Sequence, residues 1–174
     1  MAAPPTELIA QFIDAVVEDH PRAKTLLTTH PELLNARWTW DATVLHFCVV
    51  EGFIEGVKFL AQHGADVNAV NKYGDAPLVN AATLGHTEIA DILLRHGADP
   101  NARDPITGNT ALHCAAEHGN DTLVALLLTA GADPRYRTGL DETVFDVLPL
   151  AGPERERVIA VLATHGIVLD NERE

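Results

Sequence analysis

The sequence predicts an all-α solenoid, a stack of short helical repeats, because two phrases recur along it with one common period. The first phrase is Gly-Ala-Asp, and its glycines are Gly64, Gly97 and Gly131, which lie 33 and then 34 residues apart. The second phrase contains Leu45, Leu78 and Leu112, which lie at the same two spacings. A fixed period of this length is typical of identical units that bury their apolar faces only against their neighbours.

The middle unit, residues 71–103, shows why each repeat is expected to form two helices. Pro77 suits the first turn of a helix, because its missing N–H has no partner there. Gly85 adopts the left-handed conformation readily and ends this helix, so a first helix is expected over Pro77–Leu84. A second helix is expected over Thr87–Arg95, where the apolar residues share one face. That face consists of Ile89, Ala90, Leu93 and Leu94.

These phrases resemble the unit of the ankyrin-repeat family, which reads T-P-L-H-x-A-A, a glycine turn, a second helix and G-A-D-x-N-A. The matching segments are Thr43-Val44-Leu45-His46, Ala76-Pro77-Leu78-Val79 and Thr110-Ala111-Leu112-His113. The resemblance implies an ankyrin-repeat α-solenoid of helix-turn-helix units with protruding, hairpin-like finger loops. It also implies that His46 and His113 hydrogen-bond backbone atoms near those loops.

The terminal units diverge from the pattern, and we interpret them as degenerate caps, because the outer face of a terminal repeat meets water. Helices are expected over Glu7–Val17 and Arg22–Thr29 at one end, and over Arg155–Thr164 at the other. Thr143-Val144-Phe145-Asp146 stands where the T-P-L-H phrase belongs in the last unit. The chain is therefore expected to be a single domain, which divides into an N-terminal capping helix pair (6–37), repeat 1 (38–70), repeat 2 (71–103), repeat 3 (104–137), a C-terminal capping repeat (138–167) and a tail (168–174).

Composition limits the classes of partner. The chain has 25 acidic and 12 basic side chains, a formal net charge of -13, and no cluster of Lys and Arg. Nucleic acid and acidic membrane surfaces are therefore poor partners, because binding to them depends on cationic contacts to phosphate. No apolar stretch of about 18 residues is present to span a membrane. Residues 1–6 lack the features of a secretory signal, so a cytoplasmic location is expected.

No catalytic, cofactor-binding or metal-ligating residues are predicted. Cys48 and Cys114 lie in first helices two repeats apart, too far to form a disulfide, so both are expected to be reduced core thiols. His113 and His118 are five residues apart, unlike the i, i+4 pair of a zinc-binding helix. The sequence also contains no phosphate-binding glycine loop and no arrangement of serine, histidine and aspartate. We therefore expect a protein that is not an enzyme.

The surface carries the functional prediction. In an ankyrin-like arrangement, the finger tips and the last turn of each first helix line the concave face. The residues predicted to bind a partner there are Trp40, Val50, Glu51, Tyr73, Asp75, Leu84, Ile106, Glu117, His118 and Leu140. The apolar members form a stripe, and exposed aromatic anchors of this kind contribute much of the energy of protein interfaces. Two placements stay open for Trp38 and Trp40: exposed anchors, or side chains tucked against Leu33 and Leu34.

The sequence therefore predicts a non-enzymatic protein–protein interaction module that binds its partner on the concave face. The acidic rim favours a partner with a basic surface. A monomer is expected, and the role is that of an adaptor, an inhibitor or an immunity-type protein. The alternative is a structural or assembly protein that self-associates end to end, for example through the imperfect cap at Phe145–Leu150.

Overall fold

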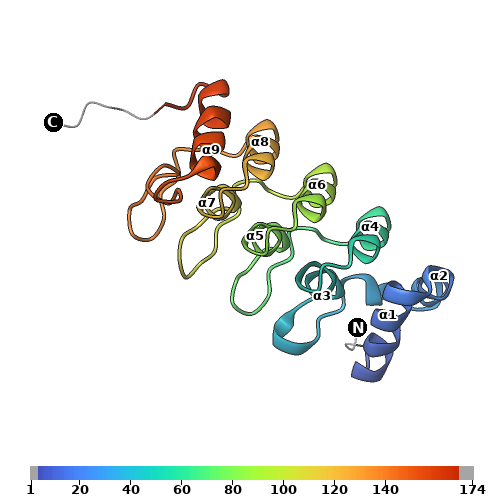
Figure 1. Ribbon diagram of the computed structural model, residues 1–174. Coiled ribbons are helices and arrows are strands. Elements are labelled where there is room, and N and C mark those ends of the chain that lie inside the picture. The colour runs from blue at the N-terminus through green and yellow to red at the C-terminus, as the bar shows by residue number, and fades with distance from the viewer. Residues whose placement is uncertain (1–3, 169–174) are drawn as a thin grey trace.

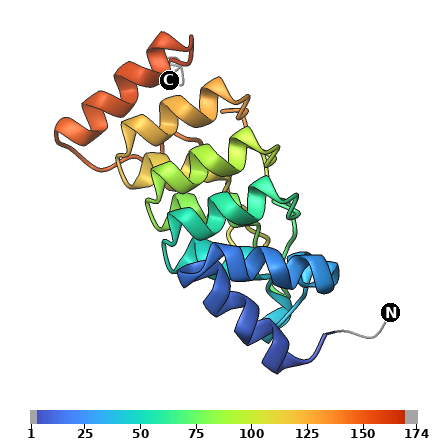
Figure 2. The ribbon, with the colours of Figure 1, turned by 90° about the vertical axis from the view of Figure 1, so that its right-hand side faces the viewer.

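The computed structural model describes residues 4–168 and confirms the all-α solenoid. Within each repeat a first helix and a second helix run side by side, and the repeats stack into two helical layers (Figure 1). Figure 2 shows the second helices as one row that continues into the last helix of the chain. The repeat helices are α3 (Val44–Val50), α4 (Ile54–Gln62), α5 (Pro77–Thr83), α6 (Thr87–Arg95), α7 (Ala111–Glu117) and α8 (Asp121–Thr129).

The amino-terminal cap is the predicted helix pair. It consists of α1 (Thr6–Glu18) and α2 (His20–Thr29), followed by the short 3-10 helix η1 (Pro31–Asn35). Helix α1 packs against α3 and α4, and its side chains Phe12 and Val16 are fully buried. The cap thus covers the open end of the first repeat with apolar residues.

The carboxyl-terminal cap keeps only its second helix, α9 (Pro153–Thr164), which packs on α8. The segment that would be its first helix forms turns instead. The Thr143 amide and hydroxyl both donate to Asp146 Oδ2, at 2.7 and 2.6 Å. Pro149 follows within the same segment, and a proline inside a helix removes a hydrogen bond and clashes with the preceding turn. Of the predicted tail 168–174, residues 169–174 lie outside the described residues.

One apolar core runs through all units. The first helices pack on one another in the order α3, α5, α7, and the second helices pack in the order α4, α6, α8, α9. Small residues allow the first helices to approach one another closely. Ala81 and Ala82 on α5 and Ala115 on α7 are completely buried. Large side chains fill the space between the layers, and those with almost no exposure include Leu33, Leu45, Leu60, Leu78, Leu93, Leu112, Leu123 and Leu162.

A repeated hydrogen bond joins successive units in the segments that lead into the finger loops. The side-chain oxygen of an asparagine accepts from the backbone N–H of the aspartate in the next Gly-Ala-Asp phrase. This asparagine ladder consists of Asn35 to Asp66 at 2.9 Å, Asn68 to Asp99 at 2.8 Å and Asn101 to Asp133 at 2.8 Å. The ladder explains why the Asn-Ala pairs at 35–36, 68–69 and 101–102 keep the period of the repeat.

Both cysteines are free and buried, as expected for core thiols. Burial in an apolar environment raises the pKa of Cys48 to about 12, because the thiolate would lose its hydration. The pKa of Cys114 is raised for the same reason. Across residues 4–168, no helix is both long and apolar enough to cross a lipid bilayer.

Candidate functional site

Four loops project from the same side of the solenoid, beyond the ends of the first helices (Figure 1). We call them finger 1 (37–43), finger 2 (70–76), finger 3 (103–110) and finger 4 (137–143). Antiparallel backbone bridges close finger 1 between Arg37 and Thr43, and finger 3 between Arg103 and Thr110. Fingers 1 and 3 are therefore hairpin-like, as the family resemblance implies.

Finger 1 holds a tryptophan in an unusual backbone conformation. Trp40 has φ 58° and ψ 29°, and Asp41 also has φ 58°. In finger 2 the residue at the Asp41 position is Gly74, with φ 86°. A bulky residue in the left-handed region is costly and needs support from its surroundings. Trp40 is nevertheless 60% exposed, so its side chain receives no compensation from burial in the core.

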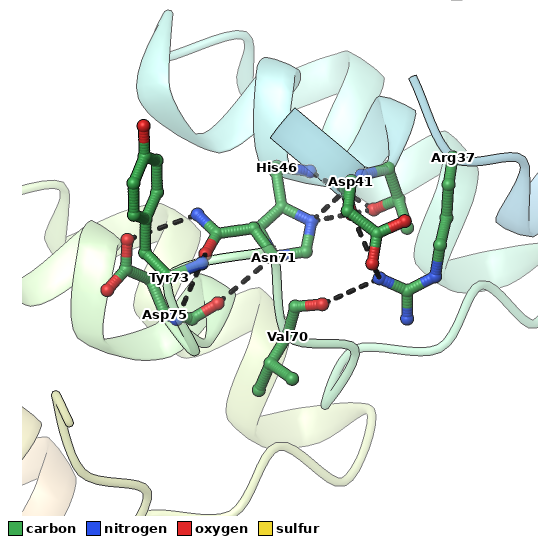
Figure 3. Close-up of polar contacts among 8 residues, drawn as sticks. Arg37, Asp41, His46, Val70, Asn71, Tyr73 and Asp75 are labelled. Carbon is green, nitrogen blue, oxygen red and sulfur yellow. Dashed lines mark hydrogen bonds and ion pairs between the residues drawn. The ribbon is translucent and has the colours of Figure 1, made fainter. Parts of the chain in front are cut away.

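A network of polar contacts holds fingers 1 and 2 together (Figure 3). The Arg37 guanidinium Nη1 donates to the Asp41 carbonyl and carboxylate, both at 2.9 Å, and to the Val70 carbonyl of finger 2 at 2.7 Å. The Lys72 N–H donates to the Trp40 carbonyl at 2.9 Å. Arg37 therefore fixes the shape of finger 1 and its position beside finger 2.

His46 adds a buried contact to this network. The Thr43 N–H donates to Nδ1 at 3.1 Å, so Nδ1 is an acceptor and the ring proton lies on Nε2. Nε2 then donates to the Asp75 carbonyl of finger 2 at 3.2 Å. Burial lowers the pKa of His46, which keeps the ring neutral. The contact to finger-loop backbone is the one that the family resemblance implies.

Finger 2 is shaped by its own side chains. Asn71 Oδ1 accepts from the backbone N–H groups of Tyr73, at 2.8 Å, and Asp75, at 3.1 Å. Asn71 Nδ2 donates to the Asp75 carboxylate at 3.1 Å (Figure 3). Because these bonds are local, finger 2 presents Tyr73, which is 50% exposed, in a defined position beside finger 1.

A cleft of about 410 Å³ lies between fingers 1 and 2 and the helices that follow them. Its floor and walls are mainly apolar and aromatic. The lining residues are Trp38, Thr39, Trp40, Ala42, His46, Phe47, Val50, Glu51, Asn71, Tyr73 and Asn80. Such a concave, aromatic-walled space with a few polar groups has the character of a binding site.

Comparison with known proteins agrees with this architecture. The family model described as ankyrin repeats in three copies matches residues 12–104, and the model of a single ankyrin repeat matches residues 107–139. The chain belongs to the ankyrin-repeat family. Its ankyrin repeats indicate a protein–protein interaction module.

Several ankyrin-containing proteins are similar to parts of this chain. The inactive serine/threonine-protein kinase TEX14 of Mus musculus is 41% identical over 91 residues, 52% of this chain and 6% of that protein. The B-cell lymphoma 3 protein homolog of Mus musculus is 36% identical over 121 residues, 69% of this chain and 26% of that protein. Cyclin-dependent kinase 4 inhibitor B of Rattus norvegicus is 41% identical over 81 residues, 47% of this chain and 62% of that protein. The matches thus span only part of each relative.

The ankyrin-repeat structure brings four of the ten predicted partner-binding residues together, since Trp40, Val50, Glu51 and Tyr73 all line the cleft. The remaining residues lie outside it. Those with exposed side chains are Leu84, Ile106, Glu117, His118 and Leu140. Asp75 is different, because it is half-buried and both its carboxylate and its carbonyl are bonded within the finger network.

Seven of the eleven cleft-lining residues were absent from the predicted set, among them Trp38, His46, Phe47 and Asn80. Trp38 is 37% exposed, and the centroid of its ring lies 6.1 Å from that of the Phe47 ring. Phe47 and Asn80 occupy the variable x position of the T-P-L-H-x-A-A phrase, where the ankyrin pattern demands no particular residue. An aromatic residue at that position is the signal that could have identified Phe47. His46 was assigned only its structural role.

Proposed function

We propose that this ankyrin-repeat chain acts by binding, without catalysis, and holds a protein partner on its concave face with the cleft between fingers 1 and 2 as the anchor point. The observation that carries the proposal is the exposed Trp40, held in a strained conformation at the mouth of an aromatic cleft. Left-handed backbone costs a non-glycine residue roughly 1–2 kcal/mol. A large side chain held at such a cost and left in solvent favours a role in recognition over a role in folding.

The binding energy is expected to concentrate at this cleft. Tryptophan and tyrosine are enriched among the few residues that dominate protein interfaces. The aromatic residues here are already positioned by bonds within the free protein, so less ordering is needed when a partner binds. The other exposed members of the predicted set, such as Ile106 and Leu140, extend the contact along the fingers.

We further propose that the chain acts as a monomer in the cytoplasm on a partner with a basic surface. The net charge of -13 supports the basic partner, because complementary charge accelerates encounter. Free, unpaired cysteines are typical of a reducing compartment. Among the adaptor, inhibitor and immunity-type roles, the similarity to cyclin-dependent kinase 4 inhibitor B favours an inhibitor, because that protein is named as one and is matched over 62% of its length.

A pull-down with tagged protein tests the proposal. The double variant Trp40→Ala with Tyr73→Ala should keep the far-UV helical signal and lose the partner that the unmodified chain retains, because both residues are exposed anchors. Leu150→Ala is the matched control, since it removes a fully exposed apolar side chain away from the cleft. Retention of the same partner by the folded double variant would sink the proposal, whereas loss with Leu150→Ala as well would indicate a different face.

The alternative function, assembly by self-association, is favoured by one observation. Leu150 is 101% exposed in the imperfect carboxyl-terminal cap, where Phe145–Leu150 forms turns in place of a helix. The solution mass measured by light scattering at increasing protein concentration separates the two functions. A mass that rises with concentration, and falls back in Leu150→Asp, would support assembly over a monomeric binding module.

A further inference from the structure

We propose that the cleft between fingers 1 and 2 receives a cationic side chain, an arginine or a lysine, from the bound protein. This inference rests on the proposed function and names the chemistry of its anchor. It follows from the ring faces that form the cleft, from a cation of the chain itself that already lies on two of those rings, and from the polar groups inside the cleft.

The walls of the cleft are aromatic on both sides. Finger 1 contributes Trp38 and Trp40, finger 2 contributes Tyr73, and helix α3 contributes Phe47. The faces of such rings carry negative electrostatic potential and attract a cation within about 6 Å of the ring centroid. The flexible apolar stem of a lysine or arginine also suits an apolar wall, because the stem buries while the charged head stays near polar groups.

Lys72 shows that two of these rings hold a cation. Its Nζ lies 5.7 Å from the Trp40 ring centroid and 4.7 Å from that of Tyr73. Lys72 does not belong to the cleft lining, whereas both rings do. Two rings of the cleft therefore already attract an ammonium group of the chain itself.

The polar groups in the cleft match a cation. Glu51 is exposed at the end of α3 and is the acidic residue among those that line the cleft. No hydrogen bond or ion pair involves its carboxylate within residues 4–168. The Asn80 amide, half-buried on α5, likewise makes no side-chain hydrogen bond in this part of the chain. An acidic oxygen and an amide oxygen accept from an ammonium or guanidinium group, whereas an aliphatic occupant would leave both unpaired.

His46, which also lines the cleft, does not oppose this occupant. Both nitrogens of His46 are engaged, one with Thr43 and the other with the Asp75 carbonyl. A second proton, on Nδ1, would point at the Thr43 N–H and replace the hydrogen bond that Nδ1 now accepts with a repulsive contact. The imidazole is therefore neutral and adds no repulsion toward an incoming positive charge.

The chain provides its own reporters for a test. It contains two tryptophans, Trp38 and Trp40, and both line the cleft. The two indole N–H signals in a ¹⁵N-correlated NMR spectrum therefore follow occupation of the cleft directly. The probes are Nα-acetyl-arginine methylamide, the citrulline derivative of the same shape without charge, and the apolar norleucine derivative, each titrated at constant ionic strength. We expect the dissociation constant of the arginine probe to be at least about fivefold lower than those of the other two.

Two charge variants sharpen the test. Glu51→Gln should reduce the preference for arginine over citrulline to below about twofold, because the cleft loses its carboxylate. Glu117→Gln is the matched control, since it removes the same charge from an exposed position at the end of α7, outside the cleft, and should keep the preference. Unchanged indole shifts before addition of probe establish that each variant is folded.

The outcomes separate this inference from the proposed function. Equal affinity for citrulline or norleucine, absence of any indole shift at the highest probe concentration, or equal effects of the two glutamine variants would each overturn the cationic occupant. Tighter binding of the norleucine derivative would also overturn the cationic occupant, but the cleft would remain the proposed anchor point for a protein partner. The proposed function is tested separately, in the pull-down. It fails if the folded Trp40→Ala, Tyr73→Ala variant retains the protein partner.

Discussion

The junction between repeats 1 and 2 and the junction between repeats 2 and 3 are alike in the asparagine ladder and different at the fingers. Each carries one step of the ladder, and the two bonds have the same length of 2.8 Å. Three hydrogen bonds, from Arg37, His46 and Lys72, join finger 1 and helix α3 to finger 2. Among the described residues, no hydrogen bond joins finger 2 to finger 3.

The difference has identifiable causes in the sequence. Val70 stands where finger 1 has Arg37, and Val79 stands where α3 has His46, so finger 2 and α5 lack the two side chains that bond the next finger. The Ile106 N–H, which is equivalent to that of Lys72, donates at 2.8 Å to the Asp104 carboxylate within finger 3. Fingers 2 and 3 instead meet where Pro105 lies against Gly74, with too little room for a β-carbon at that glycine.

Fingers 3 and 4 are bonded again, which divides the row of fingers into two pairs. Arg103 Nη2 donates to the Arg137 carbonyl at 2.7 Å, and the Gly139 N–H donates to the Thr107 carbonyl at 2.6 Å. The cleft lies within the first pair, whose members are fixed to each other. The uniform ladder therefore maintains the stack, whereas the variable finger contacts decide where a rigid binding site forms.

Replacement of the two equivalent histidines by valine should give the largest difference between repeats. Val79 shows that this position accepts valine. His46→Val removes one of the two hydrogen bonds to the Asp75 carbonyl, which keeps the Asn71 N–H, and leaves the Thr43 N–H without the acceptor Nδ1; the free energy of unfolding should fall by about 2–3 kcal/mol. His113→Val should cost about 1 kcal/mol less, because the buried Nε2 of His113 has no hydrogen-bond partner in the described residues. Urea denaturation measures both, and equal losses would contradict the comparison.

Acidification should weaken the fold through the same two rings. Burial lowers the pKa of both His46 and His113 below the ordinary value of 6.5, so below that pH the unfolded chain binds more protons than the folded one. The free energy of unfolding should therefore decrease as the pH falls through and below 6.5. Above that pH the stabilising contribution of the two neutral rings is fully present. Thermal melts across this range check the direction. The double variant His46→Val, His113→Val should show a flatter profile, and an unchanged slope would assign the effect to other groups.

The two ladder asparagines should behave alike. Asn68→Ala and Asn101→Ala each remove an acceptor for an aspartate N–H and a donor to a glycine carbonyl, at 2.8 and 3.3 Å respectively. Both positions are near the surface, so each loss should be about 1 kcal/mol. Urea denaturation of the two variants tests whether the asparagine ladder is equally strong at the two junctions. A difference well above that value would show that the ladder itself differs between the junctions.

The sequence predicted the repeating parts of this molecule better than the parts that vary. The period, the helix pairs and the closing Asn-Ala follow from contacts that every unit repeats, so one phrase identifies them all. In the last unit only a helix over Arg155–Thr164 was predicted, and α9 confirms it, while the divergent segment before it forms turns. The cleft depended on side chains from finger 1, α3 and α5 that meet only in three dimensions. Trp40, Val50, Glu51 and Tyr73 were predicted by position, but Phe47 and Asn80 stand at positions that the pattern leaves free.

The smallest expected effect comes from adding the missing arginine to finger 2. Val70 is 44% exposed, and Val70→Arg should let a guanidinium bond its own finger and finger 3, as Arg37 and Arg103 do in their pairs. The free energy of unfolding should rise by only about 0.5–1 kcal/mol, because the new bonds are exposed. Val70→Gln is the control for side-chain polarity without the charge and should give less. In Val70→Arg the amide protons of finger 3 should exchange more slowly with solvent. The indole response to the arginine probe should stay unchanged, because Arg37 bonds the backbone carbonyl of residue 70, which the substitution keeps. Altered probe binding would mean that the second junction also shapes the cleft, and that the two finger pairs do not act as separate units.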